Sequence, residues 1–329
     1  MGDLMNNYTV VFSSDDNYIV PTYVAIHSLL YHARRNDCYD VYVLAPGNLM
    51  DSSKDTISSI EKEFTNLKIH FINLGDAFSS SSLFLDHTSI PTMYRLLLPS
   101  LLPDCDKCLY LDGDILVTGD MSELFDIDME GYYVGGVRDI EADICIKKFD
   151  YDCTPPDCEN YINAGLLLMN LRLMREDGIE QKFMEYAGKK LMFADQDIVN
   201  IVCHGKIRFL ELKFNTIVKY TFVNYKQKHY SSYITDKYPI QEIYDAIDHP
   251  VMIHYAQAIK PWQCRYVYKG EKWYRYIKKN VPDNIYREHI LPYIKKYDDV
   301  DTIKRRIFLR WILYKLGIFR LVLNKQHRL

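Results

Sequence analysis

Glycine-rich phosphate-binding motifs are missing from this sequence. It has neither a G-x-G-x-x-G fingerprint nor a G-x-x-x-x-G-K-[ST] loop. Because dinucleotide-binding dehydrogenases and P-loop NTPases hold phosphates with such loops, their absence argues against both classes. No internal repeat or low-complexity tract is evident either, so we expect no repeat architecture.

The sequence also lacks an overall positive charge, a signal sequence and a clear metal-binding cysteine pattern. A formal net charge of -4 argues against nucleic acid as a general partner. The segment Met1–Asn7 is polar and runs directly into a strand-like stretch, without the pattern of a signal peptide. Cys105 and Cys108 form a C-x-x-C pair with no second pair or nearby histidines. We therefore expect reduced thiols in a cytoplasmic protein and no zinc site.

What the sequence does contain is enough apolar material for a large core. Hydrophobic residues make up 48% and aromatic residues 14% of the 329 positions. Strand-like and helix-like segments alternate, which indicates parallel βαβ units and an α/β fold. The first expected elements are a strand at Tyr8–Ser14, a helix from about Pro21, a strand at Tyr39–Leu44, a helix at Ser52–Phe64 and a strand at Lys68–Asn73.

Further strands and helices are expected later in the chain. The expected strands are Tyr132–Val137, Leu166–Met169 and Val251–Tyr255, and the expected helices are Leu171–Ala187 and Ile198–Val202. Between them, Ile140–Asn160 is irregular and rich in acidic residues. We interpret it as a long loop on the substrate side.

The central feature is the segment Lys107–Val117, which reads K-C-L-Y-L-D-G-D-I-L-V. Side chains two apart in an extended chain point the same way, so Asp112 and Asp114 can converge on one point. Two carboxylates at the end of an apolar strand suggest a site for Mg²⁺ or Mn²⁺, although a solvated turn is the alternative. The polar cluster after the first strand also falls at a strand end, where ligands bind in open α/β sheets.

With these residues aligned, the chain resembles the family 8 glycosyltransferases, which include bacterial lipopolysaccharide galactosyl- and glucosyltransferases and glycogenin. The resemblance covers roughly residues 8–275. No single motif is decisive, but six in the same order and spacing are specific together. They are F-S-S-D-D-N-Y (12–18), H-T-S-I-P-T-M-Y-R-L (87–96), L-Y-L-D-G-D-I-L-V (109–117), N-A-G (163–165), D-Q-D (195–197) and H-Y-A-Q-A-I-K-P-W (254–262).

The resemblance implies a GT-A fold, a mixed but mainly parallel sheet with helices on both faces, and a retaining reaction from a UDP-sugar donor. It implies Mn²⁺ as the cofactor, with Mg²⁺ as an alternative, held by Asp112, Asp114 and His254. It also implies roles in donor binding for Asp15, Asn17, Tyr18, Arg95, Asp112, Ala164 and Lys260, and a catalytic set of Gln196, Asp195, Asp139 and Asn163. One departure is Gln257, which stands where the family usually has a glycine beside the diphosphate.

Each of these residues also has a structural interpretation. His254 alone could be an ordinary core histidine, and Asp195 could simply favour a helix N-terminus. Asn163 could be a turn former and Arg95 could pair with a core carboxylate. A retaining reaction normally uses a nucleophile on the face opposite the leaving group, but Gln196 is a poor one. We therefore favour front-side transfer, in which a diphosphate oxygen takes the proton of the acceptor hydroxyl.

The basic tail needs its own interpretation. Residues 302–323 mix arginine and lysine with aromatic and aliphatic side chains, and the charges are too frequent for a membrane span. An interfacial amphipathic helix attracted to an anionic leaflet is one hypothesis, and a helix packed on the core or on a dimer partner is the other. We divide the chain into a GT-A catalytic domain at 1–275 and a C-terminal membrane-association region at 276–329.

The sequence therefore favours a cytoplasmic enzyme on the inner face of the cell membrane. It would move galactose or glucose from UDP to a glycan or lipid-linked acceptor such as lipopolysaccharide. The alternatives are a glycogenin-like protein glucosyltransferase and a non-catalytic nucleotide-sugar-binding protein at the membrane. A metal-dependent phosphohydrolase would leave the tyrosine-bearing uridine motif without a role. The oligomeric state is left open.

Overall fold

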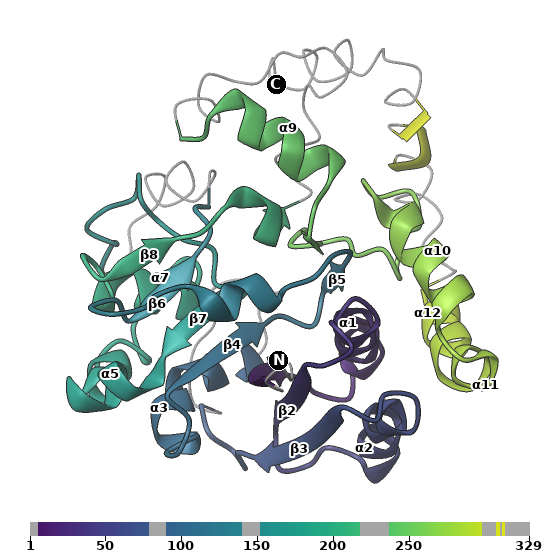
Figure 1. Cartoon of the computed structure of the whole chain (residues 1–329), viewed down its shortest axis with the longest axis horizontal. Helices are drawn as coiled ribbons and strands as arrows, with labels where there is room; N and C mark the ends of the chain where they lie inside the picture. The colour runs from purple at the N-terminus through teal and green to yellow at the C-terminus, as the bar shows by residue number, and fades with distance from the viewer. Residues whose placement is uncertain are drawn as a thin grey trace, which may run out of the picture.

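A seven-stranded sheet runs through the middle of the molecule (Figure 1). The computed structural model describes residues 6–78, 90–139, 152–217, 237–297, 307–309 and 311–312. Strand β7 is antiparallel to both of its neighbours, and the remaining pairs are parallel. The mixed, mainly parallel sheet is therefore confirmed. Its strands, in spatial order, are β3 (Leu67–Asn73), β2 (Cys38–Ala45), β1 (Asn7–Ser13), β4 (Lys107–Leu111), β7 (Leu166–Asn170), β6 (Val134–Gly136) and β8 (Ile207–Phe209).

The first part of the chain folds as the alternating pattern predicts. Strands β1, β2 and β3 are parallel and joined by helical segments, which confirms the βαβ units. Pro21 lies in the first turn of its helix, where a missing N–H costs nothing. The connecting helices are α1 (Ile19–Tyr31) and α2 (Asp51–Ser58), and a 3-10 turn at Ser59–Lys62 continues α2.

Helices cover both faces of the sheet, because alternate side chains of its strands enter two separate cores. On β4, Leu109 and Leu111 pack with the core that includes α1, while Cys108 and Tyr110 pack with the opposite one. The second core is closed by η2 (Ile90–Leu97), α3 (Leu98–Leu101), α5 (Leu171–Glu176), α6 (Ile179–Met184) and α7 (Asp195–Val202).

The single helix expected at Leu171–Ala187 is wrong. The chain forms two short helices, α5 and α6, separated at Gly178. Gly178 adopts φ 62°, a left-handed conformation that glycine accepts without a side-chain penalty. Apolar periodicity continues across this break, which is why the pattern alone predicts one helix.

A second, three-stranded sheet brings the C-terminal half to the end of β4. Strand β10 (Met252–His254) lies between β5 (Ile115–Val117) and β9 (Thr216–Ile217). His254 pairs with Ile115, so it lies beside Asp114. The chain turns between β4 and β5 at Gly113, where a Cβ atom would lie 2.6 Å from the Thr22 hydroxyl oxygen. This glycine lets the turn approach α1.

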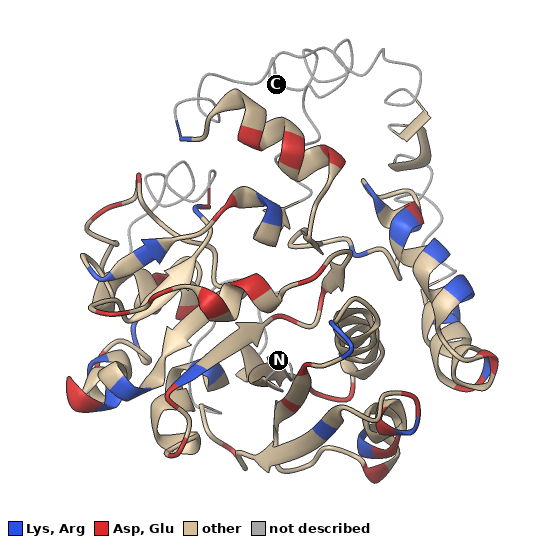
Figure 2. Cartoon of the chain, viewed as in Figure 1, with Lys and Arg blue, Asp and Glu red and all other residues tan. Residues whose placement is uncertain are grey.

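The helices after residue 237 pack on the body of the protein. Buried side chains of α10 and α12, such as Trp273 and Tyr293, belong to the same core as α1. Figure 2 shows basic residues along α10 and acidic residues along α9. The helices after residue 237 are α9 (Ile240–Asp248), α10 (Gly270–Asn280), α11 (Asp283–Ile285), a π-helical turn at Tyr286–Ile290 and α12 (Leu291–Lys295). Two 3-10 turns come earlier in the chain, η3 (Ser122–Asp126) and η4 (Leu212–Asn215).

The proposed membrane tail at 302–323 lies outside the described residues, except for 307–309 and 311–312. In those short pieces, the rings of Phe308 and Trp311 lie 4.6 and 5.6 Å from the Tyr266 ring, measured between centroids. No helix in the described ranges has the length and apolar character needed to cross a membrane. The division of the chain at residue 275 stays a prediction.

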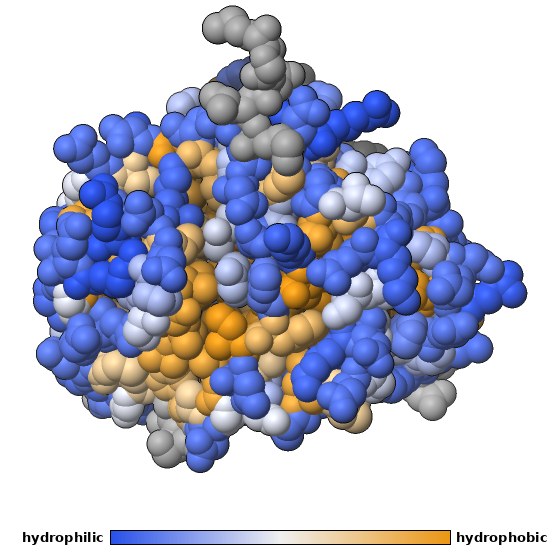
Figure 3. Space-filling view, turned by 60° about the horizontal axis from the view of Figure 1, so that its bottom comes forward, coloured by the Kyte–Doolittle hydropathy of each residue, from blue (hydrophilic) through white to orange (hydrophobic). Residues whose placement is uncertain are grey.

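The edge of the main sheet is only partly covered. Ile69, Phe71 and Ile72 of the edge strand β3 are half-buried. Figure 3, in which the bottom of Figure 1 comes forward, shows hydrophobic residues gathered at the surface between hydrophilic ones.

Candidate active site

The candidate site lies where β1, β4 and β10 end. Asp15 follows β1, Asp112 follows β4, and these two strands are neighbours in the sheet. His254 is the last residue of β10. The two polar strand ends singled out in the sequence are therefore adjacent, at the edge of the sheet where ligands bind in open α/β folds.

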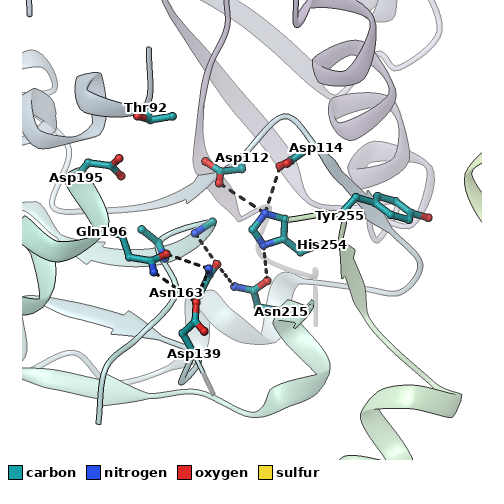
Figure 4. Close-up of polar contacts among 12 residues, drawn as sticks. Thr92, Asp112, Asp114, Asp139, Asn163, Asp195, Gln196, Asn215, His254 and Tyr255 are labelled. Carbon is teal, nitrogen blue, oxygen red and sulfur yellow. Dashed lines mark hydrogen bonds and ion pairs between the residues drawn. The ribbon is translucent and has the colours of Figure 1, made fainter. Parts of the chain in front are cut away.

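Three possible metal ligands meet at this edge (Figure 4). Donor atoms of Asp112, Asp114 and His254 all lie within 4.8 Å of one another. The His254 Nε2 atom is 3.3 Å from Asp114 Oδ1 and 3.7 Å from Asp112 Oδ2. Asp114 and His254 are only 7% and 3% exposed. Two carboxylates and an imidazole form a donor set suited to Mn²⁺.

The hydrogen bonds behind His254 determine which ring nitrogen faces the carboxylates. The Gly165 N–H donates to Asn163 Oδ1 at 2.9 Å, which fixes that atom as oxygen. The Asn215 group facing the same atom, at 2.9 Å, must then be its NH₂. Asn215 Oδ1 consequently faces His254 Nδ1 at 3.0 Å and accepts its proton. In neutral His254, Nε2 is therefore an unprotonated atom pointing at two carboxylates.

This arrangement fits a cation. A lone pair and two carboxylate oxygens would repel one another unless a positive charge lies among them. A divalent cation would also use the tautomer that Asn215 selects, as outer hydrogen bonds commonly do for metal-bound histidines. The residues present therefore fit the Mn²⁺ that the resemblance to family 8 implies.

Gly165 makes room for the histidine ring. A Cβ atom at this position would lie 2.2 Å from His254 Cε1 and 2.7 Å from His254 Nδ1. Both are far below van der Waals contact, so a side chain here would displace the ring. Close packing against the His254 ring therefore explains why the third residue of the N-A-G motif is glycine.

Lys260 holds the second carboxylate. Its Nζ atom donates to Asp114 Oδ2 at 2.6 Å and to the Tyr255 carbonyl at 2.9 Å, and the residue is 8% exposed. Burial alone would raise the pKa of Asp114, but the Lys260 ammonium, together with the His254 ring when that ring is protonated, outweighs it and holds this pKa well below its usual range. Asp114 is therefore a carboxylate at any physiological pH.

Arg95 links the carboxylate of Asp112 to that of Asp195. Its Nη2 atom is 2.8 Å from Asp112 Oδ1 and its Nε atom is 3.0 Å from Asp195 Oδ2. It also donates to the Ala164 carbonyl. Burial raises the pKa of Asp195 to about 6, a rise that the Arg95 guanidinium opposes and Asp112 reinforces. Arg95 is thus a buried clamp between the metal ligands and the start of α7.

Gln196 is held by an amide network. Its Oε1 atom accepts from Asn163 Nδ2 at 3.0 Å and from the Ala164 N–H at 2.9 Å. Its Nε2 atom donates to Asp139 Oδ2 at 3.4 Å, and Asn163 also donates to Asp139 at 3.2 Å. Figure 4 shows Gln196 and Asp139 grouped around Asn163, and Asp195 nearer Thr92, so all four residues expected to form the catalytic set lie around the site.

The loop after β1 is a tight turn. The Asp15 carboxylate accepts the backbone N–H groups of Asn17 and Tyr18, both at 3.0 Å. The Asn17 side chain is exposed and the Tyr18 ring is half-buried. The Tyr18 ring meets the Trp262 ring edge to face, with centroids 5.7 Å apart. One polar and one aromatic side chain therefore remain available on this loop.

Sequence reasoning missed Asn215. It is fully buried and connects His254 to the amide network. It lies in a segment with no clear periodicity and belongs to none of the six motifs, so no local signal points to it. Thr92, whose hydroxyl hydrogen-bonds the Asp195 carboxylate, lies within a motif but carries no charge that would single it out.

Comparison with known proteins shows that this fold is shared with a solved glycosyltransferase. The galactosyltransferase LgtC, solved in complex with donor and acceptor sugar analogs, superposes with a TM-score of 0.67. The match covers 85% of this chain and 99% of LgtC, at 24% identity. Sheet topology and superposition together define a GT-A glycosyltransferase fold.

The particular family follows from the sequence match. Residues 9–265 match the family described as "Glycosyl transferase family 8", and the chain belongs to that family. Glycosyltransferase GlyB of Streptococcus pneumoniae is 28% identical over 79% of this chain. A lipopolysaccharide 1,2-glucosyltransferase of Escherichia coli is 25% identical over 93% of this chain and 87% of its own length. The match to GlyB spans 58% of that relative's own length.

Proposed function

We propose that this protein is a retaining, metal-dependent glycosyltransferase that transfers galactose or glucose from a UDP-sugar to a glycan or lipid-linked acceptor. The observation that carries the proposal is the cluster of Asp112, Asp114 and His254 in a chain of family 8, with His254 Nδ1 facing Asn215 Oδ1 and Nε2 facing two carboxylates.

Asp112, Asp114 and His254 would hold Mn²⁺ or Mg²⁺, and Asp15, Asn17 and Tyr18 would bind the uridine. The bound metal supplies Lewis acidity that neutralises charge on the departing diphosphate. Lys260 contributes a fixed positive charge at the same place, since its ammonium is already buried against Asp114.

Arg95, Asp139, Ala164 and Asp195 would line the donor hexose together with Asn163 and Gln196. Both polar atoms of the Gln196 amide are engaged in hydrogen bonds, which makes its oxygen a still poorer nucleophile. The Asp195 carboxylate is likewise paired with Arg95. These contacts support front-side transfer.

In the front-side reaction the bond between the anomeric carbon and the diphosphate oxygen breaks. The acceptor hydroxyl oxygen bonds to the same face of that carbon, and its proton passes to a diphosphate oxygen. Trapping a covalent sugar on Asp195 or Gln196 would contradict this course.

The acceptor is proposed from the relatives. One of them acts on lipopolysaccharide by its name, and it aligns over nearly all of this chain. The basic and aromatic tail would suit a lipid-linked acceptor at an anionic membrane surface, and we propose that the protein works at the cytoplasmic face of that membrane. Flotation with anionic and neutral vesicles, with and without the tail, tests this part separately. Equal flotation of both forms would remove it.

The enzymatic proposal is tested by a screen of UDP-sugars with and without Mn²⁺. We expect Mn²⁺-dependent turnover of a UDP-hexose by the full chain and none by Asp114→Asn. Asp177→Asn is the matched control. The Asp177 carboxylate also accepts hydrogen bonds from two side chains, Tyr133 and Lys206, but it lies between α5 and α6, away from the site. Sugar added to the protein itself without acceptor would indicate the glycogenin-like alternative. UDP binding that needs no Mn²⁺, with no turnover, would indicate a non-catalytic protein.

A further inference from the structure

Three aromatic residues from distant parts of the chain meet beside the loop after β1. Tyr18 belongs to that loop, Trp262 follows β10, and Tyr293 lies on α12. The Trp262 ring is 5.7 Å from Tyr18 and 6.4 Å from Tyr293, measured between centroids. Trp262 also comes two residues after Lys260, which holds Asp114. The cluster therefore joins the C-terminal helices to the proposed donor site.

Tyr293 makes a hydrogen bond across this cluster to the backbone of the loop. Its hydroxyl donates to the backbone carbonyl of Asn17 at 2.6 Å. On the other side of the same turn, Asp15 accepts the N–H groups of Asn17 and Tyr18. Hydrogen bonds thus hold the turn at the N–H groups of Asn17 and Tyr18 and at the Asn17 carbonyl, while Asn17 itself is exposed. Such bonding sets the direction of side chains that the loop presents to a ligand.

The helix that carries Tyr293 is firmly placed. Ile290, Tyr293 and Ile294 are buried at 1%, 6% and 8% exposure in the core that includes α1. This helix lies beyond residue 265, where the family match ends. The contact therefore joins a helix outside the matched range to a loop within it.

We propose that Tyr293 is a positioning residue for the donor nucleotide, acting through the Asn17 carbonyl without touching the ligand. The proposal rests on the proposed function, since it takes the loop at Asp15–Tyr18 as the uridine site. It makes the helices after residue 265 part of the donor site.

The test is Tyr293→Phe in the full chain, with UDP as the probe. Loss of one hydrogen bond that orders the loop is expected to weaken UDP binding about three- to tenfold. The KM for the UDP-sugar should rise by the same factor while kcat changes little. Hydrogen exchange at the Asn17 and Tyr18 amides should become faster.

Tyr276→Phe is a matched control. The Tyr276 hydroxyl also makes a 2.6 Å hydrogen bond from the C-terminal helices to the N-terminal half, but to His27 Nδ1 on α1. It should destabilise the protein similarly and leave UDP binding unchanged. Equal UDP affinity in Tyr293→Phe and wild type would overturn the inference, as would equal weakening by both variants. If the wild-type protein does not bind UDP at all, the proposed function itself fails.

Discussion

Replacing Asn215 with alanine should weaken metal binding without touching a metal ligand. Asn215 is fully buried and accepts the proton of His254 Nδ1 at 3.0 Å, which leaves Nε2 free for a cation. Alanine removes this acceptor. The ring can then rotate or place its proton on Nε2, and either change competes with metal binding.

The size of the effect follows from what is lost. Changing a hydrogen-bond partner of a metal-bound histidine typically costs about 10- to 100-fold in metal affinity. The substitution also leaves a buried histidine N–H without a partner, which costs about 1–3 kcal/mol of folding free energy. Asn163 Oδ1 keeps its bond from the Gly165 N–H, so the amide network should survive in part.

Isothermal titration with Mn²⁺ in the presence of UDP measures the affinity, and ¹⁵N NMR of the imidazole reports which ring nitrogen carries the proton. Asn170→Ala is the control. Asn170 is also buried, accepting from the Leu173 N–H and donating to the Met129 carbonyl, but it lies far along β7 from the site. It should lose comparable stability and keep its Mn²⁺ affinity. Unchanged Mn²⁺ affinity in a folded Asn215→Ala protein would refute the assigned tautomer.

Three further predictions concern the residues around this network. Gly165→Ala should lower Mn²⁺ affinity at least as much as Asn215→Ala, because the new Cβ atom would overlap the His254 ring; wild-type affinity in the same titration would contradict it. Arg95→Met should cost about 3–5 kcal/mol in urea unfolding, since it leaves Asp112 and Asp195 without their buried counter-charge; a loss below 1 kcal/mol would count against the clamp. Asp195→Asn should abolish transfer yet stabilise the protein at pH 7.5. Burial raises the pKa of Asp195 from 3.8 to about 6, so the free energy of unfolding of the wild type falls as the pH rises through this range. The gain of the variant, at most about 3 kcal/mol, should shrink as the pH falls to about 4, and a gain independent of pH would argue against the raised pKa.

Much of the fold follows from local patterns. Alternation of apolar runs predicts β1, α1, β2 and β3 because each pattern indicates one element, and a helix between two successive strands lets them pair in parallel. The break at Gly178 escaped prediction, because apolar spacing continues through it. The reversal of β7 also depends on packing between distant segments, which no local pattern reports.

The candidate site divides in the same way. Charged residues in motifs, such as Asp112 and Lys260, can be proposed from the sequence because their chemistry is specific. Asn215 and Tyr293 cannot, because an amide or a phenol has many uses and only tertiary contacts show what each one touches. Gly113 illustrates a role that changes with structure. The sequence shows it only as the residue between Asp112 and Asp114, whereas the structure shows that close contact with Thr22 on α1 requires glycine there.

The charge balance of the site also becomes clear only in three dimensions. Asp112, Asp114 and Asp195 contribute three carboxylates, and Arg95 and Lys260 contribute two cations within ion-pair distance. These ion pairs leave one carboxylate charge unbalanced beside the His254 Nε2 atom, and the Asp139 carboxylate, which accepts from the amides of Asn163 and Gln196, contributes a further negative charge. A divalent cation bound by a nucleotide diphosphate would suit such a site, because the diphosphate brings further negative charge with it.

The most direct measurement is turnover of UDP-galactose and UDP-glucose by the full chain, with the anomeric configuration of the product followed by NMR. The account predicts Mn²⁺-dependent release of UDP, a product with the same anomeric configuration as the donor, and loss of turnover in Asp114→Asn but not in Asp177→Asn. If neither UDP-hexose is turned over and Asp114→Asn binds UDP and Mn²⁺ as the wild type does, the assignment of this site is wrong.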